Sequence, residues 1–350
     1  MSEFNNRETV LSVDNLTISF RTINGMVRAV RGISFDLKRG ETVAIVGESG
    51  SGKSVSIKSI MGILPGNAVV DSGTIMYEGR NLLEISKKDY HKIRGAKIGL
   101  IFQDPLSALN PIMRIGKQLT ETIKLSYPKI SKKDARKRAV ELMESVGIAE
   151  ADKRFDQYPF QFSGGMRQRI VIAIALARDP EVLICDEPTT ALDVTVQARI
   201  LDLINDIKKK RDLSVIFITH DMGVVANMAD RINVMYAGKI VEKGTAEEIF
   251  YEPAHPYTQS LLAAMPDLET EETLASIPGV PPNMIYPPEG DAFAARNPHA
   301  LKIDFEKEPP FFQLSETHFA ATWTLHPNAP EIEMPEVLKK RIERIKEANK

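Results

Sequence analysis

Short runs of strand-forming residues alternate with helical stretches from Leu11 to about Phe250. The clearest predicted strands are TVAIVG, KIGLIFQ, EVLICDEP, SVIFITH and RINVMYAGKIVEKG. Four of them are nearly continuous runs of Val, Ile and Leu, which is typical of parallel strands buried on both faces. The pattern therefore predicts a layered α/β fold.

Residues from about 104 to 180 interrupt this alternation with a helical pattern. The clearest segment is SKKDARKRAVELMESVGI, with apolar residues at Ala139, Leu142, Met143 and Val146 and charged residues elsewhere. We interpret this part of the chain as a helical insert within the α/β core.

The pattern changes again after residue 250. Residues 266–330 contain 11 of the 21 prolines and little periodicity, and a short helical pattern follows at residues 335–350. We therefore predict a first domain over residues 1–250 and a C-terminal extension over residues 251–350.

Composition narrows the class of protein. A hydrophobic content of 43% in 350 residues is enough for one large or two modest globular units. The longest apolar run, residues 170–177, is shorter than the roughly 18 residues needed to cross a membrane, and the N-terminus lacks a signal-peptide core. We therefore expect a protein that neither spans a membrane nor is secreted by that route.

The 45 Lys and Arg nearly balance the 47 Asp and Glu, which disfavours nucleic acid as the main partner. The single cysteine, Cys185, excludes an internal disulfide and fits a reducing cytosol.

The segment VAIVGESGSGKS places an apolar strand before a glycine-rich loop, and the helical run VSIKSIMGIL follows it. Inward-pointing N–H groups of such a loop, together with a helix N-terminus, are suited to bind phosphate. The candidate phosphate-binding residues are Gly47, Ser49, Gly50, Ser51, Gly52, Lys53 and Ser54. We expect Lys53 to bridge the β- and γ-phosphates of a nucleotide, and the Ser54 hydroxyl to coordinate Mg²⁺. The alternative is an incidental glycine-rich turn, and the flanking strand and helix count against it.

The predicted strand EVLICDEP ends in two carboxylates. Asp186 is suited to hold Mg²⁺ through water, and Glu187 to orient or deprotonate a water that attacks the γ-phosphate. The alternative is an acidic turn, and the phosphate loop upstream favours hydrolysis.

Two further polar residues end predicted strands, at the edge where open parallel sheets collect ligands. His220 follows SVIFIT and is a candidate γ-phosphate contact, although a lone histidine at a strand end is more often structural. Gln103 follows IGLIF and leads into the helical insert, so its amide is a candidate to sense both Mg²⁺ and the orientation of the insert. An ordinary polar loop residue is the alternative for Gln103.

Ser163, Gly164 and Gly165 precede a long predicted helix, whose N-terminus is a second potential anion site. No lysine or acidic partner accompanies these residues. On physical grounds alone, a simple helix cap by Ser163 is therefore the favoured interpretation.

Together these motifs resemble those of an ABC-type ATPase over about residues 10 to 250. They are the Walker A loop (Gly47 to Ser54), the Q-loop (Gln103), the signature FSGGM (Phe162 to Met166), Walker B with its glutamate (Asp186, Glu187), the D-loop ALD (Ala191 to Asp193) and the switch histidine (His220). The resemblance implies a P-loop fold of the ABC type, with a RecA-like core, an antiparallel β-subdomain and a helical insert, and it implies hydrolysis of ATP with Mg²⁺. It also implies that two subunits pack head to tail, so that the signature residues of one bind the γ-phosphate of ATP on the other.

Two single residues follow from the same resemblance. The family stacks adenine on an aromatic residue near the N-terminus, which corresponds to Phe20 here. The alternative for Phe20 is the inward end of the alternating strand LTISF. Asp193 corresponds to the D-loop carboxylate.

The segments GESGSGKS, IFQDPLSALNP, FSGGMRQRIVIAIALA and CDEPTTALDVTVQA are further similar to the D-type ATPase subunit of oligopeptide and dipeptide permeases, and EPAHPYTQSLLAAMP resembles the start of its C-terminal extension. The resemblance implies a peripheral ATPase on the cytoplasmic side of the cell membrane that couples ATP-driven dimerisation to oligopeptide import. The implied partners are a second, F-type ATPase subunit, two membrane permease subunits and an extracellular peptide-binding protein, with no nucleic acid.

Other functions of the same ATPase class stay open from the sequence. Dipeptides, nickel or another small solute are alternative cargoes. A non-transport ABC ATPase is a distant alternative, because the chain has one cassette and only about 110 residues separate Ser54 from Ser163.

In many D-type subunits four cysteines of the extension hold an iron–sulfur cluster. The frame around them is retained at Gly290, Phe293, Arg296, Pro298 and Ala300, whereas Asp291, Asn297, Asp304 and Thr322 stand at the cysteine positions. These side chains cannot replace four thiolates around iron, so we predict no iron–sulfur cluster. We expect aromatic packing to hold the extension instead, through Phe293, Phe305, Phe311, Phe312 and Trp323, and the extension to support contacts between paired ATPase subunits.

Overall fold

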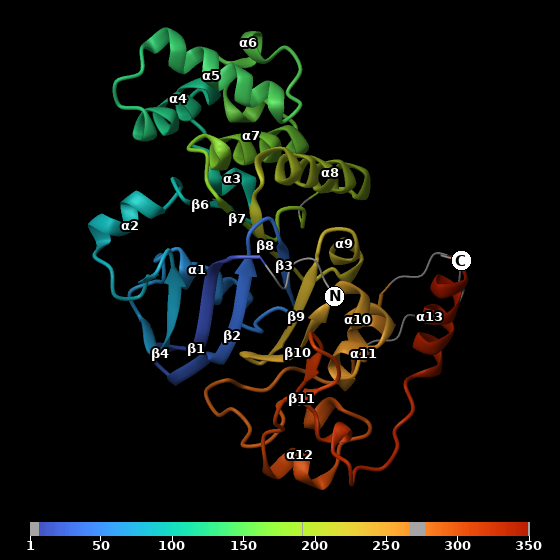
Figure 1. The fold of residues 1–350 in the computed structure, drawn as a ribbon. Coiled ribbons are helices and arrows are strands. Elements are labelled where there is room, and N and C mark those ends of the chain that lie inside the picture. The colour runs from blue at the N-terminus through green and yellow to red at the C-terminus, as the bar shows by residue number, and fades with distance from the viewer. Residues whose placement is uncertain (1–6, 191, 266–276, 349–350) are drawn as a thin grey trace. The chain divides into compact units, whose positions relative to one another are not determined.

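The computed structural model describes residues 7–190, 192–265 and 277–348. The chain forms two compact units, which are described separately below (Figure 1). The first comprises Met1–Val10, Leu37–Thr42 and Glu84–Ile218, and the second comprises Leu11–Asp36, Val43–Leu83 and Thr219–Lys350. Within the described ranges, no helix is both long and apolar enough to cross a membrane.

Three parallel strands form the centre of the first unit. They are β6 (Ile98–Ile101), β7 (Val182–Asp186) and β8 (Ser214–Thr219), whose last residue belongs to the second unit. The register pairs Ile98 with Val182 and Val182 with Ser214. All residues of β7 and β8 are buried, as the continuous apolar runs predict.

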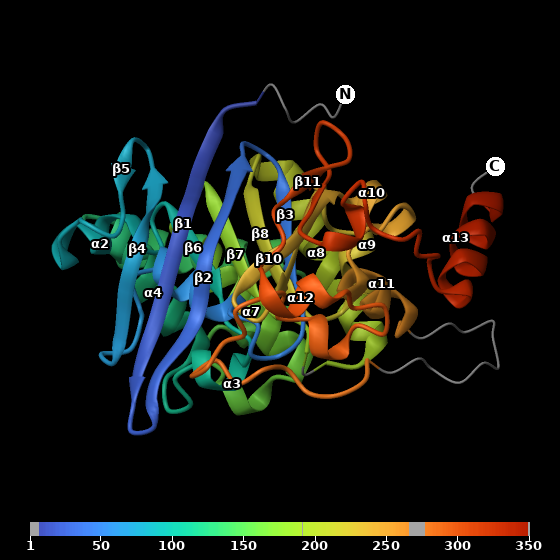
Figure 2. The same ribbon diagram turned by 90° about the horizontal axis from the view of Figure 1, so that it is seen from below.

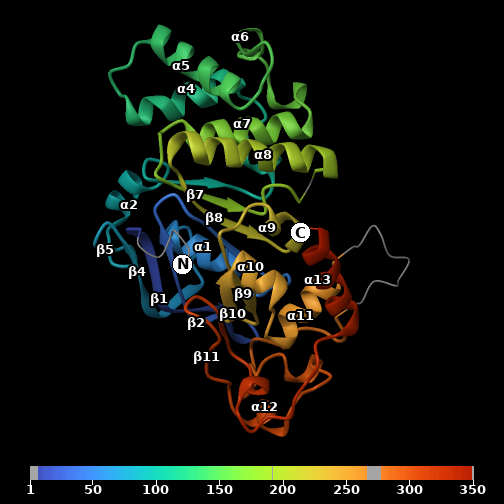
Figure 3. The ribbon, with the colours of Figure 1, turned by 45° about the vertical axis from the view of Figure 1, so that its right-hand side comes forward.

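Helices make up the rest of the first unit. They are α2 (Lys87–Ile93), α3 (Pro105–Ala108), α4 (Ile115–Ser126), α5 (Lys132–Ser145), α6 (Ala151–Arg154), η1 (Pro159–Gln161), α7 (Gly164–Leu176) and α8 (Val194–Arg211). Figure 3 shows α7 and α8 side by side, with α4 and α5 beyond α7. The four apolar positions predicted for the helical segment, Ala139, Leu142, Met143 and Val146, are all buried. Burial of one face in this way is what fixes an amphipathic helix in a bundle.

The second unit contains an antiparallel sheet in the order β2-β1-β4-β5. Its strands are β1 (Thr9–Thr22), β2 (Gly25–Lys38), β4 (Ala68–Tyr77) and β5 (Arg80–Asn81); the outer ends of β1 and β2 belong to the first unit. Leu11 pairs with Tyr77 and Phe20 with Ala68, and the register shifts between Asp14 and Ile18.

A second group of strands in this unit carries the phosphate loop. β3 (Thr42–Val46) lies parallel to β9 (Arg231–Tyr236), and β9 pairs antiparallel with β10 (Lys239–Thr245). The segment RINVMYAGKIVEKG, predicted as one strand, is therefore a hairpin, and that prediction was wrong. Ala237 and Gly238 form its turn with φ of 45° and 83°, the positive values that a tight two-residue hairpin turn requires.

The C-terminal part of the second unit packs on these strands. It consists of α9 (Met222–Ala226), α10 (Ala246–Tyr251), α11 (Pro256–Ala263), η2 (Ala294–Arg296), α12 (Lys302–Glu306), β11 (Phe312–Gln313), β12 (Phe319–Ala320), η3 (Trp323–Leu325) and α13 (Glu336–Ala348). Earlier in the chain, α1 (Lys53–Ile60) directly follows the phosphate loop and belongs to the same unit. β12 pairs with β10, and β11 pairs with β12, so the chain returns to the hairpin (Figure 2).

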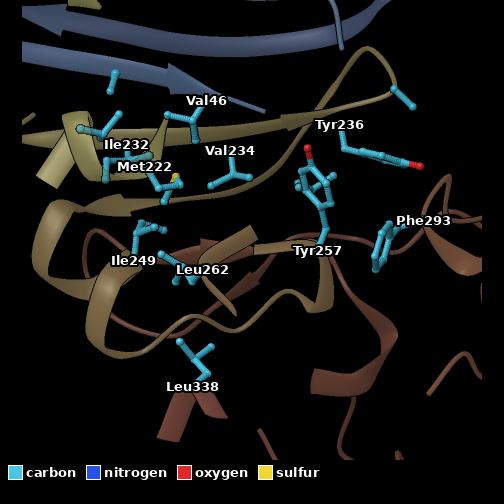
Figure 4. Close-up of a cluster of buried hydrophobic side chains, with 14 of the residues drawn as sticks. Val46, Met222, Ile232, Val234, Tyr236, Ile249, Tyr257, Leu262, Phe293 and Leu338 are labelled. Atoms are coloured by element: carbon cyan, nitrogen blue, oxygen red, sulfur yellow. The ribbon is translucent and has the colours of Figure 1, made fainter. Parts of the chain in front are cut away.

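One hydrophobic cluster joins this C-terminal part to the strands of the phosphate loop (Figure 4). Val46 of β3 and Tyr236 of β9 belong to this cluster. The C-terminal part contributes Tyr257 of α11, Phe293 directly before η2, and Leu338 of α13. The C-terminal segment is thus part of the core of this unit.

The predicted aromatic packing of the extension is only partly correct. Phe293 is completely buried, and Phe312 contacts Trp323 with ring centroids 6.5 Å apart. In contrast, Phe305 is 59% exposed and Phe311 is 48% exposed, so neither can anchor the extension by burial. Their position in proline-rich sequence gave no periodicity from which the buried face could be read.

Buried polar side chains supply the remaining support. Asp291, Asn297, Asp304 and Thr322, the residues at the expected cysteine positions, are all at most 7% exposed. Each accepts a hydrogen bond from a backbone N–H two or three residues away, those of Phe293, His299, Leu301 and Thr324 respectively. Such local bonds fix turns that a hydrophobic core alone would leave undetermined.

Glu242 of β10 is a further polar support and is completely buried. Its carboxylate accepts the backbone N–H groups of Ala254 (2.7 Å) and His255 (3.0 Å) and lies 2.7 Å from Nε2 of His318. One side chain of the hairpin therefore holds both the start of α11 and the strand region near β12.

Candidate functional site

The phosphate loop connects β3 to α1 in the second unit. Gly47, Gly50 and Gly52 have φ of 148°, 80° and 103°, values that other residues rarely adopt. A Cβ on Gly47 would lie 2.0 Å from the Met235 carbonyl oxygen, and one on Gly52 would lie 2.5 Å from the Ala29 carbonyl oxygen. The neighbouring backbone therefore admits only glycine at these two positions, and the loop curls as a phosphate-binding turn requires.

Lys53 is the first residue of α1 and is buried within this loop. Its ammonium donates to the carbonyl oxygens of Gly47 (2.6 Å) and Glu48 (2.8 Å), and it lies 3.4 Å from Oγ of Ser51. Ser54 follows in the first turn of the helix. A positive charge held against the loop backbone at a helix N-terminus is suited to polyphosphate.

The first unit brings together two of the predicted site residues, Gln103 and Glu187. Nε2 of Gln103 donates to Oε2 of Glu187 at 3.0 Å, and Oγ1 of Thr190 donates to the same oxygen at 3.0 Å. Glu187 has φ of 46°, and its N–H donates to the Ile218 carbonyl on β8. A left-handed glutamate is a strained conformation of the kind found at functional sites, and here the hydrogen bonds hold it.

Asp186 is the last residue of β7 and is 7% exposed, beside Cys185 in the same strand. Burial, with the nearby Asp186 charge as a second cause, raises the pKa of the Cys185 thiol. Cys185 is therefore a buried apolar residue of the strand with no reactive thiolate.

The glycines of the FSGGM motif open α7 in the same unit. Oγ of Ser163 accepts the N–H of Met166, so the predicted helix cap is present. A Cβ on Gly164 would meet its nearest neighbour, Leu192, at 3.7 Å, whereas one on Gly165 would lie 2.6 Å from Cγ1 of Val196. Within this chain, packing thus requires glycine at position 165 but leaves room at position 164.

The two remaining predicted site residues are Asp193 and His220. Asp193 caps α8 by accepting the N–H of Val196 at 3.0 Å, and Ala191 of the same motif lies outside the described residues. His220 follows β8 and is exposed.

Phe20, the candidate for adenine stacking, is half-buried on β1. The alternation expected for LTISF fails because Ile18 and Ser19 are both buried, next to the register shift of β1. A place at the inward end of a regular alternating strand therefore does not fully explain the position of Phe20.

The predicted residues are divided between the units. The phosphate loop, His220 and Phe20 belong to the second, and Gln103, Ser163, Gly164, Gly165, Asp186, Glu187 and Asp193 belong to the first. In the part of the chain that the structure describes, no group of three or more His, Cys, Asp or Glu is placed to hold a metal ion. The hydroxyl of Ser54, the carboxylate of Asp186 and the amide of Gln103 are nevertheless oxygen ligands of the type that Mg²⁺ prefers.

Sequence reasoning gave no role in the site to Glu48, Tyr257 or Arg296. Glu48 lies inside the phosphate loop, its N–H donates to the Tyr257 hydroxyl at 2.8 Å, and its carboxylate pairs with Arg296 at 2.6 Å. The available signals were the His-Pro-Tyr-Thr stretch and the retained Arg296 of the extension. Neither indicates a contact with a loop more than two hundred residues earlier.

Comparisons with known proteins agree with this geometry. The ABC transporter family matches residues 30–190, and the C-terminal region of oligopeptide and dipeptide transporters matches residues 241–303. The oligopeptide transport ATP-binding protein OppD of Bacillus subtilis is 57% identical over 339 residues, which cover 96% of this chain and 94% of that protein. The dipeptide transport ATP-binding protein DppD of Lactococcus lactis is 56% identical over 326 residues, covering 93% of each.

Solved structures show the same fold. The ATP-binding cassette MJ0796 bound to ADP and Pi has a TM-score of 0.61 and 27% identity, covering 67% of this chain and 98% of that one. The cbiO1 protein from Clostridium perfringens, part of the ABC transporter complex cbiONQ, has a TM-score of 0.60 and 30% identity, covering 70% of this chain and 92% of that one.

The predicted fold class is confirmed: the phosphate loop, the parallel strands and the helical segment are those of an ABC-type ATPase cassette. The chain belongs to the family of oligopeptide and dipeptide transport ATP-binding proteins of ABC transporters, and it binds and hydrolyses ATP.

Proposed function

We propose that the protein energises the import of oligopeptides by an ABC transporter. One observation carries this proposal: the similarity to OppD of Bacillus subtilis covers 96% of the chain and so includes both the ATPase cassette and the C-terminal segment. OppD of Escherichia coli, another oligopeptide transport ATP-binding protein, is 46% identical over 297 residues. The second candidate cargo is dipeptides, which the similarity to DppD favours.

We assign the catalytic roles as the motifs predict. Gly47, Ser49, Gly50, Ser51, Gly52, Lys53 and Ser54 bind the ATP phosphates. Ser54 and Gln103 would hold Mg²⁺, with Asp186 acting through water, and the ion would neutralise charge on the phosphates. Glu187 orients or deprotonates the attacking water. The hydrogen bond from Gln103 to Glu187 supports this role, because it links a candidate Mg²⁺ ligand to the candidate base. His220 contacts the γ-phosphate, and Phe20 stacks on adenine.

The signature and D-loop residues act in a paired site. Ser163, Gly164 and Gly165 bind ATP held by a second ATPase subunit, and Asp193 lies at the junction. The room for a side chain at Gly164 supports this role, since packing within the chain does not account for glycine there. The dimeric structure of the MJ0796 cassette supports the same arrangement by analogy.

The remaining partners are proposed from the family. The second ATPase is a related but distinct subunit, and the F-type assignment rests on the sequence resemblance alone. Two membrane permease subunits and an extracellular peptide-binding protein complete the importer, which places this chain peripherally on the cytoplasmic side of the cell membrane. We keep the boundary near residue 250, and the helical subdomain over about residues 104 to 180, as parts of this proposal.

Affinity purification of the tagged chain from its native membrane tests the assembly. We expect two membrane subunits and a second ATPase to co-purify in near-equal amounts. Recovery of ribosomes or DNA without them would overturn the importer assignment.

Uptake measurements test the cargo. A strain that lacks the gene should lose uptake of labelled oligopeptides, and the wild-type gene should restore it. Restoration of dipeptide or nickel uptake alone would replace oligopeptides as the cargo.

A further inference from the structure

Glu48 brings a negative charge into the loop that must receive the phosphates of ATP. An unneutralised carboxylate at this position would repel a polyphosphate, because like charges a few ångströms apart repel strongly where bulk water does not screen them. The structure shows how Glu48 is held, and its partners come largely from the C-terminal segment.

All three polar groups of Glu48 are engaged. Its N–H donates to the Tyr257 hydroxyl at 2.8 Å, and its carbonyl oxygen accepts from the Lys53 ammonium at 2.8 Å. Its carboxylate accepts two parallel bonds from the Arg296 guanidinium, at 2.6 and 3.0 Å. A bidentate pair of this kind fixes orientation as well as neutralising charge.

Arg296 is itself fixed by groups of the same unit. Its Nε donates to the Pro278 carbonyl at 2.7 Å, and a terminal nitrogen lies 3.1 Å from the Tyr236 hydroxyl. Its side chain is only 5% exposed, and the hydrogen bonds to Glu48 raise its pKa further above the ordinary arginine value. The guanidinium is therefore a permanent, immobile cation beside the loop.

Tyr257 is fixed by packing. It is completely buried, and its ring centroid lies 4.5 Å from that of Tyr236 and 5.3 Å from that of Phe293. The hydroxyl that holds the Glu48 N–H thus projects from a rigid aromatic cluster (Figure 4).

We propose that the C-terminal segment positions the phosphate loop for nucleotide, with Arg296 neutralising Glu48 and Tyr257 fixing its backbone. Both are positioning residues, which act through Glu48 and do not touch the nucleotide. The proposal depends on ATP binding by this chain and is independent of the cargo and of the membrane partners.

The test is a cycle of variants in the full chain, with ADP affinity measured by calorimetry in Mg²⁺ buffer. Arg296→Gln should raise the Kd for ADP about tenfold, equivalent to about 1.4 kcal/mol, because Glu48 is left unpaired. Adding Glu48→Gln to Arg296→Gln removes the unpaired carboxylate, so the double variant should bind ADP more tightly than Arg296→Gln alone and recover most of the lost affinity. Arg296→Lys keeps the positive charge but not the bidentate geometry, so its Kd for ADP should lie between those of the wild type and Arg296→Gln.

Steady-state hydrolysis supplies a second readout. Arg296→Gln should raise the KM for ATP while kcat stays within about twofold of the wild type, the signature of lost uniform binding. Wild-type affinity in Arg296→Gln, or failure of Glu48→Gln to restore it, would overturn the proposal.

Two further variants guard against loss of fold. Tyr257→Phe keeps the aromatic cluster and removes only the hydroxyl, so it should raise the Kd by about threefold, the scale of a single hydrogen bond; an unchanged Kd would count against the proposal. Arg341→Gln is the matched control, because that guanidinium donates to the carbonyls of Leu262 and Met265 in the same unit. Equal weakening by Arg341→Gln would show general loosening of the segment and refute the specific role of Arg296.

Discussion

Replacement of Phe293 by alanine measures how strongly the C-terminal segment is bound into the second unit. Phe293 is completely buried, and its ring lies 5.4 Å from Tyr236 in an edge-on contact and 5.3 Å from Tyr257. Truncation of a buried phenylalanine costs about 3–5 kcal/mol, and this range includes the loss of ring–ring contacts of about 0.5–1.5 kcal/mol each. For a unit of this size the loss corresponds to a fall in melting temperature of roughly 10 °C.

The chain contains one tryptophan, Trp323, which provides the assay. Its indole N–H donates to the Lys307 carbonyl at 2.8 Å, and its ring contacts Phe312. Its fluorescence during urea unfolding therefore reports on the C-terminal segment. Phe305→Ala is the matched control, since this ring is 59% exposed and its loss should change stability by less than about 0.5 kcal/mol.

The reasoning is refuted if Phe293→Ala lowers the free energy of unfolding by less than about 1 kcal/mol, well below the range for a buried ring. An equal effect of the two alanine variants would refute it as well, because only one of these rings is buried.

Three further predictions concern the site and its supports. Glu187→Gln should bind ATP normally but lower hydrolysis by about 10²- to 10⁴-fold, whereas exposed Glu144→Gln should hydrolyse like the wild type; undiminished turnover in Glu187→Gln would remove its assigned role. Gly47→Ala places a Cβ 2.0 Å from a backbone oxygen and should weaken ATP binding by at least about tenfold, whereas Gly66→Ala, which meets no neighbour within 4 Å, should not; equal affinities in a nucleotide titration would contradict the steric argument. Burial raises the pKa of Asp304, so the folded state binds more protons there than the unfolded state, and the wild type loses stability as the pH rises through the folded-state pKa. Asp304→Asn should therefore gain stability relative to the wild type as the pH rises above the ordinary aspartate pKa of 3.8 in urea titrations, and a constant difference would contradict this sign.

Elements with a strong local pattern were predicted from the sequence. β7 and β8 are continuous apolar runs that only a doubly covered strand satisfies, and the apolar spacing of residues 131–148 fits one helical face. The phosphate loop was predictable for a different reason: its glycines are required by backbone conformation and by close neighbours, so the constraint is visible in the residues themselves.

Features that depend on distant parts of the chain were not predicted. The pair between Glu48 and Arg296 joins residues 248 positions apart, and no periodicity links them. The burial of Phe293 and the exposure of Phe305 likewise depend on where an irregular segment meets the hairpin. The hairpin itself was missed because Ala237 does not mark a turn as Asn or Asp would.

The support of the phosphate loop by the C-terminal segment has a consequence for biosynthesis. Tyr257 and Arg296 are synthesised 209 and 248 residues after Glu48, so the phosphate loop of a nascent chain has its full support only once Arg296 has emerged from the ribosome. A premature stop codon between Tyr257 and Phe293 would leave every ATPase motif intact, yet the product would lack Arg296 and the Phe293 ring that packs on Tyr236 and Tyr257. Such a fragment would be a substrate for chaperones and proteases rather than a smaller ATPase.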